Sequence, residues 1–304
     1  MVRVLPHRGH ETPDAWRGRA SGFLFPEDRE VAVAVRVDEG ARVDRDAAEV
    51  YEPAARRRLE KETRRAVKKA RVLFAVSEFT KRELVETFRV SADRVVVAPN
   101  AVNPAVFRTL DESTVAPILQ RYRLSRHYFL YVGRMDAKKN VKTLIRAFEL
   151  FKKDRGLGDP FELVLVGSKG YGFSEIKLYV EHSTVREHIK YFGYLPEADV
   201  AGLMNAATAF VFPSWYEGFG VPPLEAAACG CPSVVSDIGA HREVMGDAAL
   251  YASPGEPEAW AKALKRMATE QTLRGELSAK GFARAAAYSW DATAKIVLDA
   301  LRVV

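Results

Sequence analysis

Two glutamates separated by seven residues, Glu217 and Glu225, lie in the segment of this 304-residue sequence that carries the clearest chemistry. Ionised carboxylates accept hydrogen bonds, so a pair of them suits a ligand that is rich in hydroxyl groups. Gly218 and Gly220 lie between them and are expected to take positive φ angles and to let a ligand approach the backbone. The Pro222-Pro223 pair is placed where the first turn of a helix tolerates proline. The segment therefore predicts a glycine loop and a helix N-terminus whose free N–H groups face an anion or sugar hydroxyls.

The elements that must position this loop are short and alternate in type. An apolar run, 209–213, predicts the strand before the loop, and an Ala-rich stretch, 224–228, predicts the helix start after it. From Leu73 onward, β-rich runs alternate with helical stretches, which is typical of βαβ units around a parallel sheet. The other predicted strands are 72–76, 94–98, 128–132, 161–167, 189–192, 233–236 and 248–251. The other predicted helices are 78–88 with Ser77 as N-cap, 141–153, 173–183, 196–206, 256–269, 271–288 and 290–302.

Five segments, in chain order, carry a resemblance to a known family: 98–102, 129–140, 192–196, 214–225 and 236–244. In that order they are similar to the family's interdomain hinge, its strand with a Gly-Arg turn and Lys-Asn helix start, its nucleobase loop, its two-glutamate loop, and the stretch after its next strand. The family is that of the retaining glycosyltransferases with GT-B architecture, family-four type (glycosyl transferases group 1). The resemblance runs from about Arg71 to the C-terminus. It implies an α/β, GT-B-like fold with a complete C-terminal Rossmann-like domain and a shortened N-terminal α/β domain.

The resemblance also implies roles for individual residues. Glu217, Arg134 and Lys139 form the expected catalytic group: the two cations would hold the nucleotide diphosphate and stabilise its departing charge without a metal. Glu217 would lie beside the donor sugar, and Glu225 would accept hydrogen bonds from the ribose hydroxyls. Tyr194 is expected either at the base or as an aromatic residue at the edge of the core. The other expected substrate-binding residues are Gly133, Leu195, Gly218, Phe219, Gly220, Val221 and Leu224.

Three domains follow from the resemblance. An acceptor-side domain would span 1–104, a nucleotide-sugar-binding domain would span 105–288, and a helix over 289–304 would cross back to the first. An acceptor-side domain of this kind normally holds roughly 150 residues or more, and about 100 residues precede the hinge at Asn100. The hydrophobic strand and glycine-rich loop that usually open such a domain have no match, so the N-terminal half is expected to be shortened.

The segment before Leu73 gives few further signals. Residues 30–37 predict a strand, whereas 1–22 show no periodicity and are expected to be poorly ordered. The family carries a histidine near the reacting sugar in this half, and neither His7 nor His10 lies in a matching context. Because few strands are predicted here, an oligomer or a partner chain is expected to cover the open sheet edge.

Three functions remain as alternatives. The leading one is a retaining, metal-independent glycosyltransferase that moves a sugar from a nucleotide-diphosphate sugar, UDP- or GDP-linked, to a glycan or lipid-linked acceptor. The second is a donor-binding, truncated paralogue without independent transferase activity, completed by a partner. The third is a basic surface-binding protein with a vestigial sugar cleft. Vesicle binding that survives Arg134→Ala and Glu225→Ala would distinguish the third from the others.

Composition excludes several other classes. The hydrophobic fraction of 48% and charged fraction of 28% are ordinary for a globular protein. No run of about 18 apolar residues predicts a membrane span, and the polar start is unlike a secretory signal, so a cytoplasmic protein is expected. Cys229 and Cys231 are expected to stay reduced. The histidines show no metal-ligand spacing and Asp-x-Asp is absent, so neither a metal nor a cofactor is expected.

The net charge of +6 is concentrated in 56–71, where the apolar positions Leu59, Ala66, Val67 and Ala70 lie near helical spacing. A solvated helix face is one interpretation of this segment. The other is contact with an anionic membrane, at the inner membrane face, or with a phosphate-bearing lipid acceptor. Nucleic acid is excluded as a partner, because no aromatic residues interleave with the charges and no nucleic-acid-binding motif is present.

Overall fold

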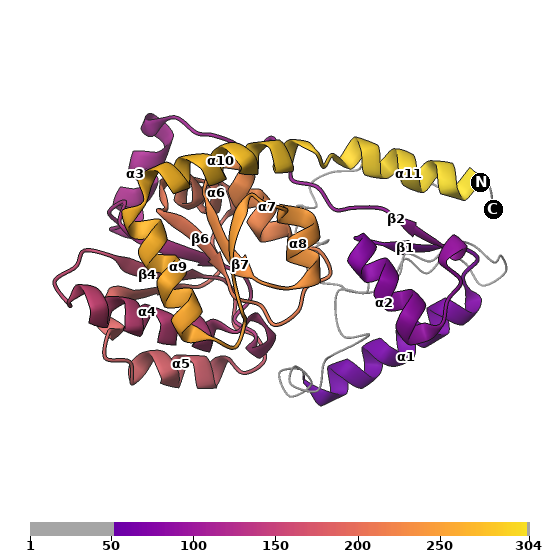
Figure 1. The fold of residues 1–304 in the computed structure, drawn as a ribbon, viewed down its shortest axis with the longest axis horizontal. Helices are drawn as coiled ribbons and strands as arrows, with labels where there is room; N and C mark the ends of the chain where they lie inside the picture. The colour runs from indigo at the N-terminus through magenta and orange to yellow at the C-terminus, as the bar shows by residue number, and fades with distance from the viewer. Residues whose placement is uncertain (1–51, 303–304) are drawn as a thin grey trace, which may run out of the picture.

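Six parallel strands form the main sheet of the structure, a computed structural model that describes residues 52–302 (Figure 1). The strand order is β5-β4-β3-β6-β7-β8, and every neighbouring pair is parallel. Strands of such sheets are buried on both faces and are therefore apolar throughout, as in the runs YFLYV and AFVF. The strands are β3 (Tyr128–Val132), β4 (Glu162–Val166), β5 (Ile189–Phe192), β6 (Ala209–Phe212), β7 (Ser233–Ser236) and β8 (Ala249–Ala252).

The order of the strands reverses between β3 and β6. Going along the chain, β4 and β5 extend the sheet on one side of β3, whereas β6, β7 and β8 extend it on the other. The loops that leave the carboxyl ends of β3 and β6 therefore diverge to opposite sides of a shared edge. In open α/β sheets, ligands bind at this topological switch point. This adjacency brings the predicted motifs 129–140 and 214–225 together.

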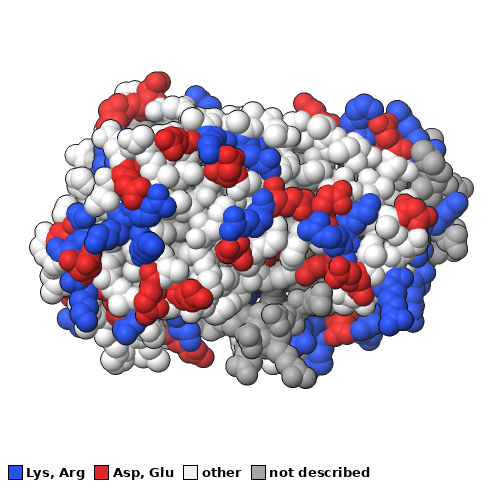
Figure 2. All heavy atoms as spheres, viewed as in Figure 1, with Lys and Arg blue, Asp and Glu red and all other residues white. Residues whose placement is uncertain are grey.

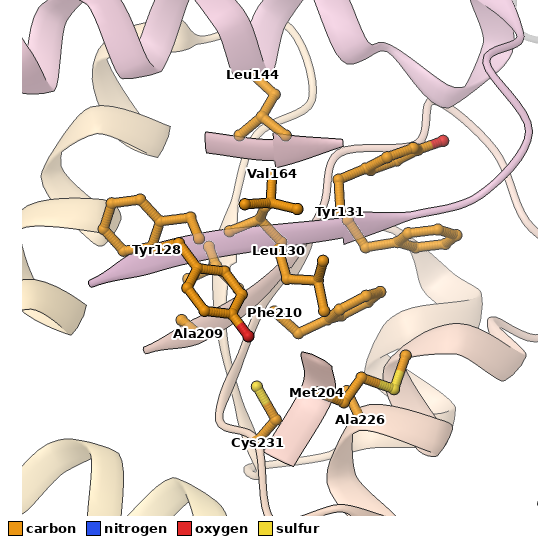
Figure 3. Packing of buried hydrophobic residues seen from close by; sticks show 14 of the residues in the cluster. Tyr128, Leu130, Tyr131, Leu144, Val164, Met204, Ala209, Phe210, Ala226 and Cys231 are labelled. Carbon is orange, nitrogen blue, oxygen red and sulfur yellow. The ribbon is translucent and has the colours of Figure 1, made fainter. Parts of the chain in front are cut away.

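Helices cover both faces of this sheet. Successive side chains of a strand point to opposite faces, and the first two residues of β3 show where each face packs. The ring of Phe129 contacts Phe148 and Phe151 of α4, whereas the hydroxyl of Tyr128 donates to the carbonyl oxygen of Leu203 in α6 at 2.6 Å. Figure 3 shows the same division, with Leu144 of α4 on one side of the strands and residues of α6 and α7 on the other.

Most helices of this part of the chain agree with the predictions, but two of them, over 112–122 and 239–245, were not predicted. The boundaries are α4 (Val141–Arg155), α5 (Phe173–Glu181), α6 (Glu197–Ala206), α7 (Val221–Ala228), α8 (Gly239–Met245), α9 (Pro257–Thr269) and α10 (Gln271–Ala286). Helix α3 (Glu112–Tyr122) was not predicted, because Pro117 lies inside it. Proline lacks the N–H that an interior turn requires, so it usually ends a helix. Here the packing of Val115, Ile118 and Leu119 into the core outweighs that cost.

A second, smaller sheet consists of β1 (Leu73–Ala75) and β2 (Val95–Val97), which are parallel. Helix α1 (Pro53–Lys69) and helix α2 (Glu78–Phe88) belong to the same part of the chain, and Ser77 caps α2 as predicted. Ala66 and Val67 of α1 pack against a small core that contains Leu73 and Leu84. Residues 56–69 of the basic segment 56–71 thus lie in a helix whose apolar residues Ala66 and Val67 are turned inward. The expectations for 1–22, for a strand at 30–37 and for His7 and His10 lie outside the described residues.

Helix α11 (Trp290–Arg302) extends from the large sheet to the small one (Figure 1). Its residues Ile296, Val297, Ala300 and Leu301 pack against Phe74 and Ala98, and the hydroxyl of Thr293 donates to the carbonyl oxygen of Pro99 at 2.6 Å. Helix α11 therefore packs on the small-sheet part of the chain, and its assignment as an interdomain crossing helix stays a prediction. Leu298 of the same helix does not take part in this packing and exposes 52% of its surface. The domain boundaries at 104/105 and 288/289 stay predictions.

Candidate active site at the loops after β3 and β6

The side chains of Lys139 and Glu217 meet at the carboxyl edge of the large sheet. Lys139 Nζ donates to Glu217 Oε1 at 2.5 Å, and the two side chains expose 15% and 13% of their surfaces. The same ammonium group lies 5.2 Å from the ring centre of Phe212, the last residue of β6. Two of the three predicted catalytic residues, 78 positions apart in the chain, thus form one largely buried ion pair.

The environment of Glu217 keeps this group ionised. Burial alone raises the pKa of a carboxyl group, but the positive charges of Lys139 and Lys138, together with the hydrogen bond from Lys139, outweigh burial. The net result is a pKa of Glu217 below its ordinary value of 4.5. At neutral pH the group is a carboxylate, which can stabilise positive charge or accept a hydrogen bond but cannot donate a proton.

Arg134, the third predicted catalytic residue, lies outside this pair. Its side chain is 61% exposed, and Nε lies 3.3 Å from Asp136 Oδ1. Asp136 also accepts a hydrogen bond from the backbone N–H of Tyr171 at 2.7 Å, which fixes the turn. Gly133 permits this turn, because a Cβ atom there would lie 2.8 Å from the hydroxyl of Tyr131. The guanidinium is therefore presented to solvent from a rigid loop.

The glycine loop differs from the prediction at one of its two glycines. Gly220 has a φ of 95° and is the N-cap of α7, and a Cβ atom there would lie 2.9 Å from the ring of His241. Gly218, by contrast, does not take a positive φ. Its carbonyl oxygen instead accepts hydrogen bonds from the hydroxyls of Ser77 and Thr80, from the start of α2. The expectation of a positive φ at Gly218 was wrong. The hydrogen bonds from Ser77 and Thr80 explain the backbone conformation that this residue takes instead.

The N-terminus of α7 offers fewer donors than expected. The helix begins at Val221, so Pro222 and Pro223 occupy two of its first three positions, and neither has a backbone N–H. Only Gly220 and Val221 remain as donors among the usual four free amides of a helix start. An anion at this helix start would therefore be met mainly by side chains, and Lys139 and Arg134 are the predicted ones.

The remaining predicted substrate residues lie around this loop. Glu225 is the fifth residue of α7 and is 9% exposed. It therefore lies beyond the first turn of the helix, and the interaction of its charge with the helix dipole is weak there. Tyr194 exposes 59% of its surface, more than is usual for an aromatic residue at the edge of a core, and Leu195 packs against the core. The side chains of Phe219 and Leu224 are buried, at 3% and 0% exposed, so only their backbone groups can face a ligand.

His241 is a residue of this site that the sequence did not single out. Its ring is fully buried next to Gly220 and Phe212, and Nδ1 lies 3.0 Å from the carbonyl oxygen of Ser236. Its Nε2 has no hydrogen-bond partner among the described residues. Burial lowers the pKa of His241 to about 4, despite the nearby charge of Glu217. The imidazole is therefore neutral at neutral pH.

Other features of the described part of the chain lie apart from this site. A groove of about 870 Å³ between α4 and α5, lined by residues such as Arg146 and Tyr179, shares none of the residues named above. Within residues 52–302, no cluster of three or more His, Cys, Asp or Glu side chains is arranged to hold a metal ion. None of the helices in that range combines the length and apolar character that crossing a membrane requires. Cys229 and Cys231 are buried free thiols, and burial raises the pKa of Cys229 to about 12.

Comparison with known proteins places this geometry in a family. The family described as glycosyl transferases group 1 matches residues 121–284, and Glycosyltransferase Family 4 matches residues 42–106. O-antigen chain mannosyltransferase B of Escherichia coli is 33% identical over 256 residues, which cover 84% of this chain and 66% of the relative. The serotype-specific mannosyltransferase WbdA of Escherichia coli is 28% identical over 76% of this chain and 28% of its own length. The chain thus spans less than two thirds of each of these relatives.

Solved structures show the same fold. The crystal structure of Anabaena HepE in complex with UDP and glucose superposes with a TM-score of 0.72 at 19% identity, covering 80% of this chain and 67% of the other. Sucrose-phosphate synthase from Thermosynechococcus elongatus gives a TM-score of 0.70 at 23% identity, covering 84% and 63%. The predicted α/β, GT-B-like fold is confirmed. With more than half of its residues matched, and with a Rossmann-like parallel sheet, the chain belongs to the glycosyl transferases group 1.

Proposed function

We propose that this chain transfers a sugar from a nucleotide-diphosphate sugar to an acceptor, with retention of configuration and without a metal ion. The observation that carries the proposal is the buried Lys139–Glu217 pair at the switch point of the sheet. It combines a cation for a phosphate with a carboxylate for a sugar in one place. The names of the relatives favour mannose as the sugar, and a glycan or lipid-linked molecule is proposed as the acceptor.

In the proposed reaction, the bond between the anomeric carbon and the diphosphate oxygen breaks while a bond to the acceptor oxygen forms on the same face. The departing diphosphate takes the acceptor's proton. Lys139 and Arg134 stabilise the charge that develops on the phosphates, since fixed cations act most strongly where charge appears in the transition state. Glu217 faces the sugar, where a carboxylate stabilises developing positive charge, and Glu225 accepts hydrogen bonds from the ribose. The protein thereby supplies positioning and electrostatics rather than a proton-transfer group.

The proposed contacts of the nucleobase and of the sugar ring are inferred from which side chains and backbone groups are exposed. Tyr194 presents its ring to solvent after β5, where a nucleobase can stack on it. The backbone amides of Phe219 and Gly220 lie in the glycine loop, where they can donate to sugar hydroxyls. Gly133, Leu195, Val221 and Leu224 complete the proposed substrate site through backbone atoms or partly buried side chains.

The test is calorimetric titration with UDP, GDP, UDP-glucose and GDP-mannose, followed by a transfer assay with the ligand that binds. We expect the ligands of one nucleotide to bind, and this binding should persist in excess chelator. The product of the transfer assay should have the anomeric configuration of the donor, as determined by NMR. An inverted product would refute the retaining mechanism, and failure of all four ligands to bind at millimolar concentration would refute the donor site.

A second candidate is donor binding without independent turnover. The observation that favours it is the size of the small sheet, which has only two strands within residues 52–302. An open two-stranded sheet is marginally stable alone, and its edges are free to pair. An oligomer or a partner chain would then cover the edges and complete the acceptor side. Repeated turnover by a chain shown to be monomeric by light scattering would exclude this candidate.

Peripheral contact with an anionic membrane, at its cytoplasmic face, is proposed for the segment 56–71. In α1, Arg57, Lys61, Arg65 and Lys69 follow one another at intervals of four residues and are exposed. Figure 2 shows blue side chains gathered over this helix. Each basic residue near an anionic membrane surface contributes about 1 kcal/mol to the free energy of binding to that membrane. Sedimentation with vesicles of neutral and of anionic lipid tests the proposal, and equal binding to both would contradict it. Nucleic acid is not proposed as a partner.

A further inference from the structure

The start of helix α2 lies directly on the loop that carries Glu217. Ser77, the N-cap of α2, donates its hydroxyl proton to the carbonyl oxygen of Gly218 at 2.6 Å and accepts the backbone N–H of Thr80 at 3.0 Å. The hydroxyl of Thr80 lies 3.1 Å from the same carbonyl oxygen. Ser77 and Thr80 are 1% and 0% exposed. Two buried hydroxyls from the small-sheet part of the chain therefore hold one peptide group of the loop.

Two further contacts fix α2 in this position. The carboxylate of Glu243, in α8, accepts the backbone N–H groups of Glu78 and Phe79, each at 2.7 Å. This arrangement satisfies the amides at the helix start that a side chain within α2 does not reach. The hydroxyl of Tyr216 donates to the carboxylate of Glu83, and both side chains are buried. The loop thus contacts α2 on both sides of Glu217, through Tyr216 and Gly218.

The position of Glu217 depends on these contacts. Its carboxylate is held by Lys139 from the large sheet, while the next peptide group is held by Ser77 and Thr80. Without the two hydroxyls, the carbonyl of Gly218 would lose both of these donors. A buried carbonyl oxygen without a donor is costly, so the loop would move to reach solvent or another donor. Such a movement displaces the backbone between Glu217 and Gly220.

We propose that Ser77 and Thr80 are positioning residues for the sugar half of the donor site. They hold the loop 216–220 in the conformation that presents Glu217 and the amides of Phe219 and Gly220. This inference rests on the proposed function, because it assigns that loop to the sugar. The nucleotide half depends on Arg134, Lys139, Tyr194 and Glu225, none of which α2 holds through a contact described above. Loss of the two hydroxyls therefore weakens the binding of a nucleotide sugar while leaving the binding of the nucleoside diphosphate unchanged.

The variants separate this role from helix capping. Thr80→Val removes one hydroxyl at nearly constant shape, and Thr80→Ser keeps it. Ser77→Gly removes the other hydroxyl, and glycine is itself tolerated at an N-cap. The matched control is Thr87→Val with Ser91→Ala, which makes similar changes around the other end of α2. Comparison of melting temperatures identifies any variant that is merely unstable.

Two measurements decide the matter. In the free protein, hydrogen–deuterium exchange of peptides covering 214–221 is expected to be about tenfold faster in Ser77→Gly/Thr80→Val, which corresponds to two hydrogen bonds of ordinary net strength. The affinity for UDP-glucose or GDP-mannose is expected to fall by a similar factor, while the affinity for UDP or GDP stays within twofold. Thr80→Ser and the control pair are expected to match the wild type in both measurements.

The outcomes are distinct. Unchanged exchange in 214–221, or exchange that rises equally throughout α2 and α8, would overturn the inference. A parallel loss of affinity for the nucleotide sugar and the nucleoside diphosphate would also overturn it. If the wild type binds no nucleotide at all, the proposed function fails, and the exchange measurement still decides whether α2 holds the loop. If the double variant does not fold, Thr80→Val alone serves with an expected effect of about threefold.

Discussion

The side-chain amide of Asn140 donates to the carbonyl oxygen of Pro213 at 3.0 Å and so joins the loop after β3 to the loop after β6. The same amide donates to the carbonyl oxygen of Pro254 at 2.7 Å, after β8. Asn140 also has a φ of 57°, a left-handed conformation that asparagine tolerates better than most residues. One residue next to Lys139 therefore ties three loops together at the edge of the sheet.

We expect Asn140→Ala to lower the free energy of unfolding by about 2–4 kcal/mol. The change leaves two carbonyl oxygens without this donor and places alanine in a left-handed conformation, which adds about 1–2 kcal/mol. Asn140→Gly is the control, because glycine removes the same hydrogen bonds but accepts the backbone angle. Urea unfolding of the wild type and the two variants separates the cost of the lost hydrogen bonds from the cost of backbone strain. Equal losses in both variants would show that backbone strain contributes nothing.

Binding of a nucleoside diphosphate is expected to need Arg134 and Lys139 together. Losing one charge-assisted hydrogen bond costs roughly 1.5–3 kcal/mol, so the double alanine variant should bind at least about a hundredfold more weakly. Arg146→Ala with Lys153→Ala, two residues of α4 that line the groove apart from this site, is a control of equal charge change. Titration calorimetry with UDP and GDP checks the result. An unchanged affinity in the Arg134→Ala/Lys139→Ala variant would mean that the site is assigned wrongly.

The Lys139–Glu217 pair predicts a specific pH dependence of stability. Since the pKa of Glu217 is lowered in the folded protein, its contribution is complete above the ordinary value of 4.5 and is lost as the pH falls through the lower folded pKa. Lys139→Met leaves a largely buried carboxylate and should destabilise the protein by about 2–4 kcal/mol at pH 7. That difference should shrink at pH 4. Lys139→Met with Glu217→Gln should recover most of the loss, and a constant difference across this range would contradict the assignment.

His241 predicts a second pH effect. Its folded pKa of about 4 lies below the ordinary value of 6.5, so the unfolded chain binds a proton in this interval and the folded chain does not. Stability from this residue is complete above pH 6.5 and falls by up to about 3 kcal/mol as the pH approaches 4. His241→Asn should lack this slope, whereas the exposed His127→Asn should keep it. The measurement is urea unfolding of the three proteins at half-unit pH steps.

Removal of residues 289–304 is expected to loosen the small sheet. Helix α11 covers Phe74 and Ala98, so without it these side chains face water. Limited proteolysis should then cleave before Asn100 faster than in the full chain, while the large sheet stays resistant. Ile296→Ala should have a smaller effect in the same direction, and Leu298→Ala, at an exposed position of the same helix, should have almost none. Unchanged proteolysis before Asn100 would contradict the packing role of α11.

The strands and most helices were predictable because their signals are local. The run Phe129 to Val132 is apolar enough to identify a buried strand without knowledge of its neighbours, and Ser77 caps α2 through a contact three residues away. The details of the site were not predictable in the same way. The backbone of Gly218 depends on hydroxyls 138 and 141 positions away, and the burial of His241 depends on the loop before α7. Helix α3 was missed because a local signal, Pro117, opposes tertiary packing.

The order of the strands has a consequence for how the chain acquires its site during folding. Strands β3, β4 and β5 are consecutive in the chain and pair in that order, whereas 79 residues separate Leu130 of β3 from its partner Phe210 of β6. Contacts of high sequence separation form late, since the entropy of closing the loop is lost before they add stability. The ion pair between Lys139 and Glu217, 78 positions apart, is therefore expected to form after the contacts within β3, β4 and β5. A chain that binds its nucleotide has, by that fact, completed its large sheet.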